Sequence, residues 1–378
     1  MRSDQAQRGP AQRPAIFPDV RRIAILRGGG LGDLLFTVPA MRSLAAAYPD
    51  AELTLLGSPG PASILEGRQG PPDRIVPLPA IEGISNGTAS TPDPAETERF
   101  VERLRGERFD LAVQLHGGGR YSNPFLLGIG ARHTAGARTP DAAPLERNLE
   151  YAYYQHEVIR ALEIAALAGA VPVAMEPHLE ISEGERHAGR AVCGNGRPVV
   201  VIHPGATDPR RRWPAERFAV VAQRLAEDGA RVVLVGGDED TELCGGILGS
   251  ARRALGLARS ELVTSLAGRL SLSALAGVLS AADVFVGNDS GPRHLAQAVG
   301  ARTVSIYWVG NLINAGPLGR GRHRVHLSWT TRCPVCGRDA TQVGWTAERC
   351  EHDVSFVADV APEGVLDDVQ SLLAHASR

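Results

Sequence analysis

The sequence predicts an α/β protein of two domains, each a parallel sheet covered by helices. Short apolar runs alternate with helical patterns in both halves of the chain, which is the signature of such sheets. The length of 378 residues is too great for one ordinary core and suits two. We expect one domain at residues 19–185 and another at 190–360, with the seam between them in the polar stretch 183–197.

In the first half, an apolar strand at residues 22–27 runs into a glycine-rich turn. The segment 33–48 then carries apolar residues at helical spacing, so we expect a helix there. Two further strands are expected at 51–57 and 109–115. The proline- and glycine-rich span 57–94 is expected to be mainly loop.

The second half repeats the pattern more clearly. Its strands are expected at residues 198–203, 231–235, 283–286 and 302–307. Proline is tolerated in the first turn of a helix, which suits a helix beginning at Pro214. Further helices are expected at 272–281, at 291–299 and, within the C-terminal segment 361–378, at 362–375.

Composition places the chain among ordinary globular proteins, since 43% of its residues are hydrophobic and 22% are charged. It has no run of about 18 apolar residues that could span a membrane. Residues 1–18 lack the apolar core of a signal peptide and are expected to be a disordered arm. Five cysteines in so long a chain do not make a disulfide framework, so the expected location is the reducing cytoplasm.

Charge excludes two functional classes. A net charge of −2 argues against a nucleic-acid-binding protein, which usually has a basic excess. All 40 basic residues are arginine, so the lysine of a Walker-type phosphate loop is missing and that class of NTPase is excluded.

Three loops follow strands at the edge where open α/β sheets bind ligands. The first, residues 28–33, is rich in glycine, which lets a backbone approach a ligand closely, and it ends in Asp33 at or near a helix N-cap. A capping aspartate after a glycine turn is the competing interpretation. The glycine spacing does not match the dinucleotide-binding pattern, so an NAD enzyme is not favoured.

The second loop, residues 203–214, suits an anion. It places Arg210, Arg211 and Arg212 just before a helix N-terminus, where phosphate binds well. A solvated run of charge is the alternative interpretation.

The third loop, residues 287–294, also suits an anion. The first-turn amides of the following helix, the Ser290 hydroxyl and His294 would all face one crevice. Taken alone, Asp289 and Ser290 could serve only as caps, and His294 could be an internally bonded helix residue.

Together, in this order and spacing, the loops resemble the ADP-heptose:lipopolysaccharide heptosyltransferases, glycosyltransferase family 9, over residues 20–375. The first motif reads Gly-Leu-Gly-Asp-Leu-Leu-Phe-Thr-Val-Pro-Ala at 30–40. The second begins with His-Pro-Gly-Ala at 203–206 and ends with Trp-Pro-Ala-Glu-Arg-Phe at 213–218. The third reads Asn-Asp-Ser-Gly-Pro-Arg-His-Leu-Ala at 288–296. Three motifs in register argue against a chance resemblance.

The resemblance implies a GT-B fold, in which two Rossmann-like domains face each other across a cleft. It also implies an inverting glycosyltransferase that needs no metal ion or other cofactor for catalysis. Asp33 matches the family's base, which deprotonates the acceptor hydroxyl, and Arg211 takes the position of its phosphate-binding lysine. The other implied donor-side residues are Thr207, Arg212, Leu270 against the base, Asp289, Ser290, Gly291 and His294. The implied acceptor-side residues are Arg27, Gly30, Gly32, His116 and Arg120.

The chain departs from the family on the acceptor side. Gln114 stands where the family commonly has an aspartate, and residues 116–120 replace its usual Gln-Gly loop. The implied donor is ADP-heptose or a related nucleotide-sugar. The acceptor is either lipopolysaccharide core, reached by peripheral attachment at the inner face of the membrane, or a small natural-product scaffold. Two other functions stay open: a nucleotide-sugar epimerase, which needs no acceptor, and a nucleotide-binding protein without catalysis.

A separate group of residues near the C-terminus suits a metal ion. Cys333 and Cys336 flank a Pro-Val turn that can bring two thiolates onto one ion. Cys350 and His352 could complete a tetrahedral set for structural zinc, and a reduced, metal-free cysteine pair is the alternative. The remaining cysteines, Cys193 and Cys244, are expected to have no special function.

Overall fold

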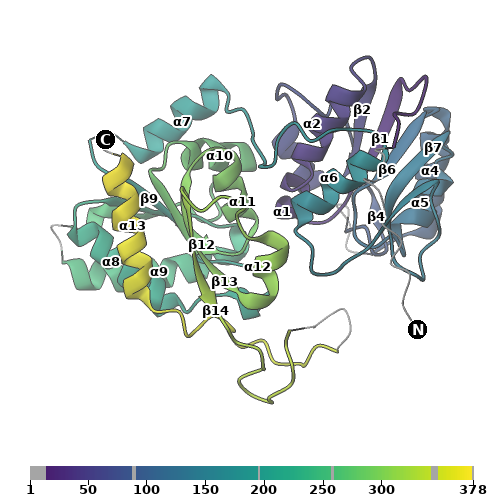
Figure 1. Cartoon of the computed structure of the whole chain (residues 1–378). Coiled ribbons are helices and arrows are strands. Elements are labelled where there is room, and N and C mark those ends of the chain that lie inside the picture. Colours follow the sequence, from purple (N-terminus) through teal and green to yellow (C-terminus); the bar gives the residue numbers. More distant parts are fainter. Residues whose placement is uncertain (1–13, 87–90, 195, 257–258, 342–347, 377–378) are drawn as a thin grey trace, which may run out of the picture.

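The computed structural model describes residues 14–86, 91–194, 196–256, 259–341 and 348–376. It contains two six-stranded sheets, one in each half of the chain, which lie side by side in Figure 1. Every strand pairing within these two sheets is parallel. The predicted α/β class and its two-domain GT-B arrangement are therefore confirmed.

The first sheet has the strand order β3-β2-β1-β6-β7-β8. Its strands are β1 (Arg22–Arg27), β2 (Glu52–Gly57), β3 (Arg74–Pro77), β6 (Leu111–Gln114), β7 (His133–Arg138) and β8 (Arg147–Glu150). Short elements between them are α3 (Pro59–Ala62), η1 (Ser63–Leu65) and the small antiparallel pair β4 (Ala80–Ile81) and β5 (Ser85–Asn86).

Helices cover both faces of the first sheet. Ile23 and Ile25 of β1 pack in the core beneath α2 (Val38–Ala47) and α6 (Glu157–Leu167). Ala24 and Leu26 pack beneath α4 (Pro94–Gly106) and α5 (Ser122–Gly128) on the opposite face. A strand buried on both faces must be apolar throughout, which is why β1 reads as one continuous apolar run.

The second sheet has the order β11-β10-β9-β12-β13-β14. Its strands are β9 (Val199–His203), β10 (Arg231–Leu234), β11 (Val263–Ser265), β12 (Val284–Asn288), β13 (Arg302–Trp308) and β14 (His323–Ser328). One face is covered by α8 (Ala215–Glu227), α9 (Thr241–Leu255) and α13 (Pro362–Ala376), and the other by α10 (Leu272–Ser280) and α11 (Gly291–Ala298). Shorter helices are η2 (Pro209–Arg211), η3 (Asp238–Asp240), η4 (Ser260–Leu262) and α12 (Val309–Ala315).

The polar stretch expected to hold the seam forms a helix, α7 (Glu183–Cys193). Ser182 and Glu185 close a reciprocal capping box at its start, which favours a helix despite the polar sequence. α7 packs tightly on α10, because a Cβ on Gly189 would lie 2.0 Å from the Gly277 carbonyl oxygen. The stretch is therefore part of the second half's helical layer.

The helix expected at residues 33–48 is two helices, α1 (Leu31–Leu35) and α2 (Val38–Ala47). Pro39 lies in the first turn of α2, where its missing N–H needs no partner, and it cannot continue a helix from α1. The span 57–94, expected to be mainly loop, also contains β3, which pairs with β2 at the sheet edge.

The expectation of a disordered arm at residues 1–18 is wrong for its last residues. Residues 1–13 lie outside the described part of the chain. Phe17 is buried in the first core, and its N–H donates to the Tyr48 hydroxyl at 3.0 Å.

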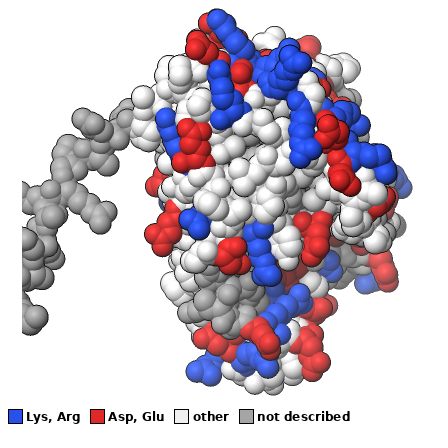
Figure 2. Space-filling model, turned by 90° about the vertical axis from the view of Figure 1, so that its right-hand side faces the viewer, with Lys and Arg blue, Asp and Glu red and all other residues white. Residues whose placement is uncertain are grey.

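Among the described helices, none is both long and apolar enough to cross a bilayer. The face of the molecule in Figure 2, on the side of the first sheet, carries acidic and basic side chains interspersed around a broad uncharged centre. This face therefore shows no large field of one sign of charge.

Candidate functional site

A cavity of about 760 Å³ lies between the two sheets and is lined by residues from both. The second sheet reverses its strand order between β9 and β12, and open sheets bind ligands at such a switch point. The implied donor-side residues all line this cavity, together with Gly30, Gly32 and Asp33 from the first half. They are Thr207, Arg211, Arg212, Leu270, Asp289, Ser290, Gly291 and His294.

Asp289 forms the buried centre of the wall that the second half contributes. One carboxylate oxygen accepts from Nη1 of Arg211 at 3.2 Å and from Nδ2 of Asn311 at 2.7 Å. The other lies 3.1 Å from Nε2 of His294. Burial alone would raise the pKa of Asp289, but the hydrogen bond from His294 and the charge of Arg211 outweigh it and hold the pKa well below its ordinary value.

His294 is held in one tautomer between two partners. Burial lowers its pKa more than the hydrogen bond to Asp289 raises it, so the imidazole is neutral. Because Nε2–H then donates to Asp289, Nδ1 is left to accept from Nη1 of Arg293 at 3.1 Å. Asp289 and His294 therefore orient their neighbours, and the groups that can meet an anion include Arg211, Arg212 and the backbone at the start of α11.

Ser290 is tied to a second buried pair that sequence reasoning did not single out. Its hydroxyl lies 3.1 Å from Nδ1 of His203, whose Nε2 lies 3.3 Å from a carboxylate oxygen of Asp240. Burial would raise the pKa of Asp240, but the hydrogen bond from His203 outweighs it and the pKa is lowered. The chain of contacts fixes the hydroxyl at the mouth of α11.

The three arginines of the second loop have different roles. Arg210 is buried, donates from Nε to Asp208 at 2.9 Å and lies over the Phe356 ring. Arg211 and Arg212 instead line the cavity, and Arg212 is anchored by a hydrogen bond from Nε to the Ala206 carbonyl at 2.8 Å. The three arginines are therefore not simply a run of charges exposed to solvent.

Asp33 faces the cavity from the first half. It occupies the third position of α1, whose N-cap is Gly30, so the expected place near the helix N-cap is confirmed. One carboxylate oxygen accepts from the Gly30 N–H at 2.8 Å, and the other accepts from Nη2 of Arg27 at 2.8 Å. About half of the side chain is still exposed to the cavity.

The two halves touch next to Asp33. A Cβ on Gly32 would lie 2.8 Å from Cδ2 of His294, and one on Gly291 would lie 3.0 Å from Cβ of Leu31. Glycine at both positions lets α1 and α11 approach, and this brings Asp33 and the Asp289 wall to one cavity.

Two of the implied acceptor-side residues, His116 and Arg120, line a second cavity of about 560 Å³ in the first half, whereas Gly30 and Gly32 line the first cavity and Arg27 lines neither. The Nε2–H of His116 donates to the Gly83 carbonyl at 2.9 Å. Burial and the nearby Arg27 charge lower the His116 pKa. Arg120 also lines this cavity, and its ion pair with Asp141, at 3.8 Å, is exposed.

Arg27 connects the two regions. It is buried, and besides Asp33 it contacts Glu157 at 3.7 Å and the Leu115 carbonyl just before His116. Gln114 is a structural tie, since its amide donates to the Ser122 hydroxyl at 2.6 Å and accepts from the Ala137 N–H at 3.1 Å.

The four predicted metal ligands also come together. The ligand atoms of Cys333, Cys336, Cys350 and His352 all lie within 4.8 Å of one another. Cys193 and Cys244 are buried elsewhere, and burial raises their thiol pKa values to about 11 and about 12. These two thiols are protonated and unreactive, as their position suggests.

Sequence reasoning did not single out Asp240, Asn311 or Glu157, which also line the cavity. Asp240 follows a Gly-Gly turn after β10, which is the same glycine-then-acid pattern as the first loop and could have flagged it. Asn311 on α12 and Glu157 at the start of α6 reach the cavity only through the tertiary fold.

Comparison with known proteins relates the chain to a known family. Residues 97–343 match the profile of glycosyltransferase family 9 (heptosyltransferase). The chain is 26% identical over 366 residues to lipopolysaccharide heptosyltransferase 2 of Escherichia coli strain K12, covering 93% of this chain and 98% of the relative. It is 28% identical to lipopolysaccharide heptosyltransferase 1 of Pseudomonas aeruginosa, covering 83% and 86%. The solved structure of E. coli ADP-heptose LPS heptosyltransferase II superposes with a TM-score of 0.72 at 23% identity, covering 95% of this chain and all of that one.

Proposed function

Because the chain belongs to glycosyltransferase family 9, we propose that it transfers a heptose from an ADP-sugar to an acceptor hydroxyl with inversion at the sugar carbon. The observation that carries the proposal is the opposition, within one cavity, of an exposed carboxylate and a cationic, anion-binding wall. The carboxylate belongs to Asp33 in the first half, and the wall belongs to the second.

The wall of the second half suits the leaving nucleoside diphosphate. Transfer builds negative charge on that group, and fixed cations and N–H dipoles stabilise such charge. Arg211 and Arg212 supply the cations, and the start of α11, with the Ser290 hydroxyl, supplies backbone amides. Leu270, in the same cavity, offers an apolar surface for the nucleotide base.

Asp33 is proposed as the general base. The acceptor oxygen attacks the sugar from the side opposite the diphosphate, and Asp33 takes its proton as the new bond forms, so a single displacement inverts the sugar carbon. Arg27 and the Gly30 N–H hold the carboxylate in place without covering it. The transfer step is proposed to need no metal ion, because Arg211 and Arg212 supply the positive charge and Asp289 is already committed to protein partners.

The acceptor is proposed to be the core of lipopolysaccharide, reached at the cytoplasmic face of the membrane. Both curated relatives compared above are named for activity on lipopolysaccharide. The second cavity, beside Arg27 and His116, lies on the half that carries the base. We accordingly assign acceptor binding to residues 19–185 and donor binding to residues 190–360.

The test is the substitution Asp33→Asn in the full chain. We expect kcat for heptosyl transfer from ADP-heptose to fall by about 10²–10⁴-fold, because the variant cannot accept the proton. The affinity for ADP, measured by calorimetry, should stay within about twofold, since the diphosphate contacts lie on the other half.

A wild-type transfer rate in Asp33→Asn would contradict the assignment of Asp33 as the general base. Isomerised sugar formed by the wild-type enzyme from donor alone would indicate an epimerase instead. Binding of ADP without turnover on any lipopolysaccharide-core or small-scaffold acceptor would indicate a protein that has lost catalysis.

A further inference from the structure

The segment that follows β14 leaves the second sheet and forms the long loop at the bottom of Figure 1. It begins with a tight turn: the Gly337 N–H donates to the Cys333 carbonyl at 2.9 Å, and the Cys333 N–H donates to the Arg338 carbonyl at 2.8 Å. Gly337 has φ of 70°, a conformation that favours glycine. This turn sets the Cys333 and Cys336 thiols on the same side of the loop.

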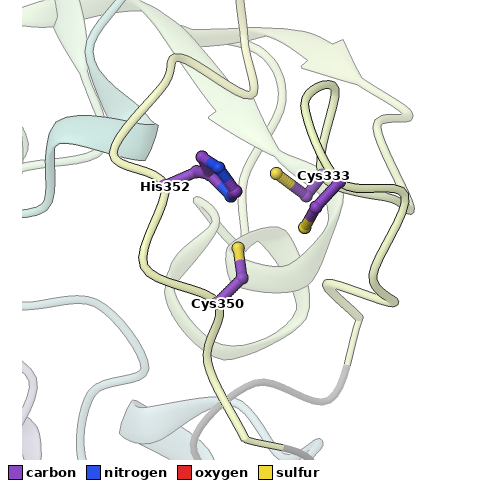
Figure 3. Close-up of side chains that lie close together, drawn as sticks. Cys333, Cys350 and His352 are labelled. Carbon is purple, nitrogen blue, oxygen red and sulfur yellow. The ribbon is translucent and has the colours of Figure 1, made fainter.

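Cys350 and His352 return to the same place from the far end of the segment. Figure 3 shows the labelled side chains pointing toward a common centre from two separate stretches of chain. The ligand atoms lie within 4.8 Å of one another. A tetrahedral zinc ion with Zn–S bonds of about 2.3 Å needs sulfur atoms about 3.8 Å apart, so a contraction of about 1 Å completes the site.

Two further observations point to a ligand at that centre. Nδ1 of His352 is buried and has no hydrogen-bond partner, which is costly for an imidazole unless something binds there. Cys333 is only 2% exposed and packs in the second core, so its thiol is fixed in place. We propose that Cys333, Cys336, Cys350 and His352 bind one zinc ion, and that this ion braces the loop that carries Arg210 and Arg211.

The brace runs through Phe356, four residues beyond His352. The Phe356 N–H donates to the Arg210 carbonyl at 2.7 Å, and its own carbonyl accepts from the Ser328 hydroxyl at 2.6 Å. The Phe356 ring is buried, and the Arg210 guanidinium lies 5.7 Å from its centroid. The metal-bound end of the segment is thus joined to the backbone of the residue before Arg211.

Zinc is the metal that this donor set favours. Three thiolates and one imidazole in a closed tetrahedral set are typical of structural zinc sites, which leave no open position for substrate. The group lies outside the residues that line the donor cavity. The ion therefore acts on folding of the segment, and its effect on the donor, which rests on the proposed function, is indirect.

The first experiment measures metal content in the full chain, purified without chelators, by plasma mass spectrometry. We expect about one zinc ion per chain in the wild type, and loss of most of it in Cys336→Ser, which removes the most exposed ligand. Val335→Ser is the matched control, because Val335 is exposed in the same turn and offers no ligand. It should keep the zinc.

Three results would overturn the zinc site. The first is a wild-type protein that neither holds zinc nor takes it up when zinc is added to the reduced chain. The second is iron in place of zinc at one equivalent. The third is a Cys336→Ser variant with wild-type zinc content.

The second experiment measures ADP affinity by calorimetry. We expect Cys336→Ser to bind ADP about tenfold more weakly and Val335→Ser to match the wild type, because a loosened segment releases Arg210 and so Arg211. Stripping zinc from the wild type with a chelator should weaken ADP binding equally, and added zinc should restore it. Unchanged ADP affinity after zinc loss would overturn the brace but leave the metal site. Failure of every protein to bind ADP, with zinc present as expected, would count against the proposed donor instead.

Discussion

The two walls of the molecule differ in how firmly their charges are held. On the donor wall, Asp289 is buried and each carboxylate oxygen has at least one partner within 3.2 Å. On the acceptor side, Arg120 and Asp141 face each other at 3.8 Å with more than half of each side chain exposed. A buried network fixes its residues one by one, whereas an exposed pair contributes little and tolerates change.

Under the proposed function, this difference indicates which side of the molecule is more specific for its ligand. The donor wall is preorganised, so its contribution to binding depends on a few irreplaceable side chains. The acceptor side presents glycines 117–119 and two exposed charges around an open cavity. If this cavity binds the acceptor as proposed, it can accommodate differences between acceptors without disturbing the fold.

The largest expected effect follows from Asp289→Asn. Removing this charge leaves Arg211 without its buried partner, which should cost about 3 kcal/mol in the free energy of unfolding at pH 7. Because the native pKa of Asp289 lies below its value in the unfolded chain, its stabilising effect is present above about pH 4 and is lost as the pH falls further. Urea unfolding of wild type and variant at several pH values should show the gap narrowing with acid.

The matched control is Asp141→Asn on the acceptor side. Its free energy of unfolding should change by less than about 0.5 kcal/mol, since the side chain is exposed. Equal losses of unfolding free energy in Asp289→Asn and Asp141→Asn would contradict the difference between the two sides.

The next largest effect is on donor binding through Arg211. In Arg211→Ala, kcat/KM for ADP-heptose should fall by about 10²–10³-fold, because a cation facing the leaving group is lost. Arg211→Lys should recover part of this and remain about tenfold below wild type, since one ammonium cannot serve Asp289 and a phosphate with the geometry of a guanidinium. Steady-state kinetics at saturating acceptor would measure both.

Arg224→Lys, on the exposed face of α8, controls for the chemical change and should leave kcat/KM unaltered. Full activity in Arg211→Ala would show that the second loop does not bind the diphosphate.

The smallest expected effect belongs to Arg120→Ala. The KM for acceptor should rise by about threefold or less, and more at low salt than at high salt, because the charge is exposed and screened. The ADP dissociation constant should not change. A tenfold rise in acceptor KM would mean that the acceptor side is as rigidly specified as the donor wall.

Sequence patterns predicted the central strands well because burial on both faces leaves an unmistakable apolar run, as in β9. The same reasoning missed β8, whose residues Arg147–Glu150 alternate between partial and full exposure at the sheet edge. It also missed α7, whose helical state depends on a capping box and on the close approach of Gly189 to Gly277. Neither feature leaves an apolar stripe in the sequence.

The candidate site likewise contains some residues that the sequence predicts and others that only the structure identifies. The family resemblance carried by the three motifs predicted that Asp33, Arg211 and Asp289 belong to one site, and all three line the same cavity. It could not reveal that Arg210 turns away from that cavity toward Phe356, since both arginines occupy the same basic run. Asn311 donates to Asp289 from a helix that carries no recognisable motif, so only the tertiary fold identifies it.

The contact between Gly32 and His294 also bears on the fate of the donor before transfer. A base that activated a water molecule next to a bound nucleotide-sugar would cause hydrolysis of that donor instead of transfer to the acceptor. Here Asp33, the proposed base, and the proposed diphosphate wall belong to separate halves of the chain, and α1 and α11 touch beside them through Gly32 and Gly291. A separation of α1 from α11 would move the proposed base away from the sugar carbon, and so would protect the donor from hydrolysis.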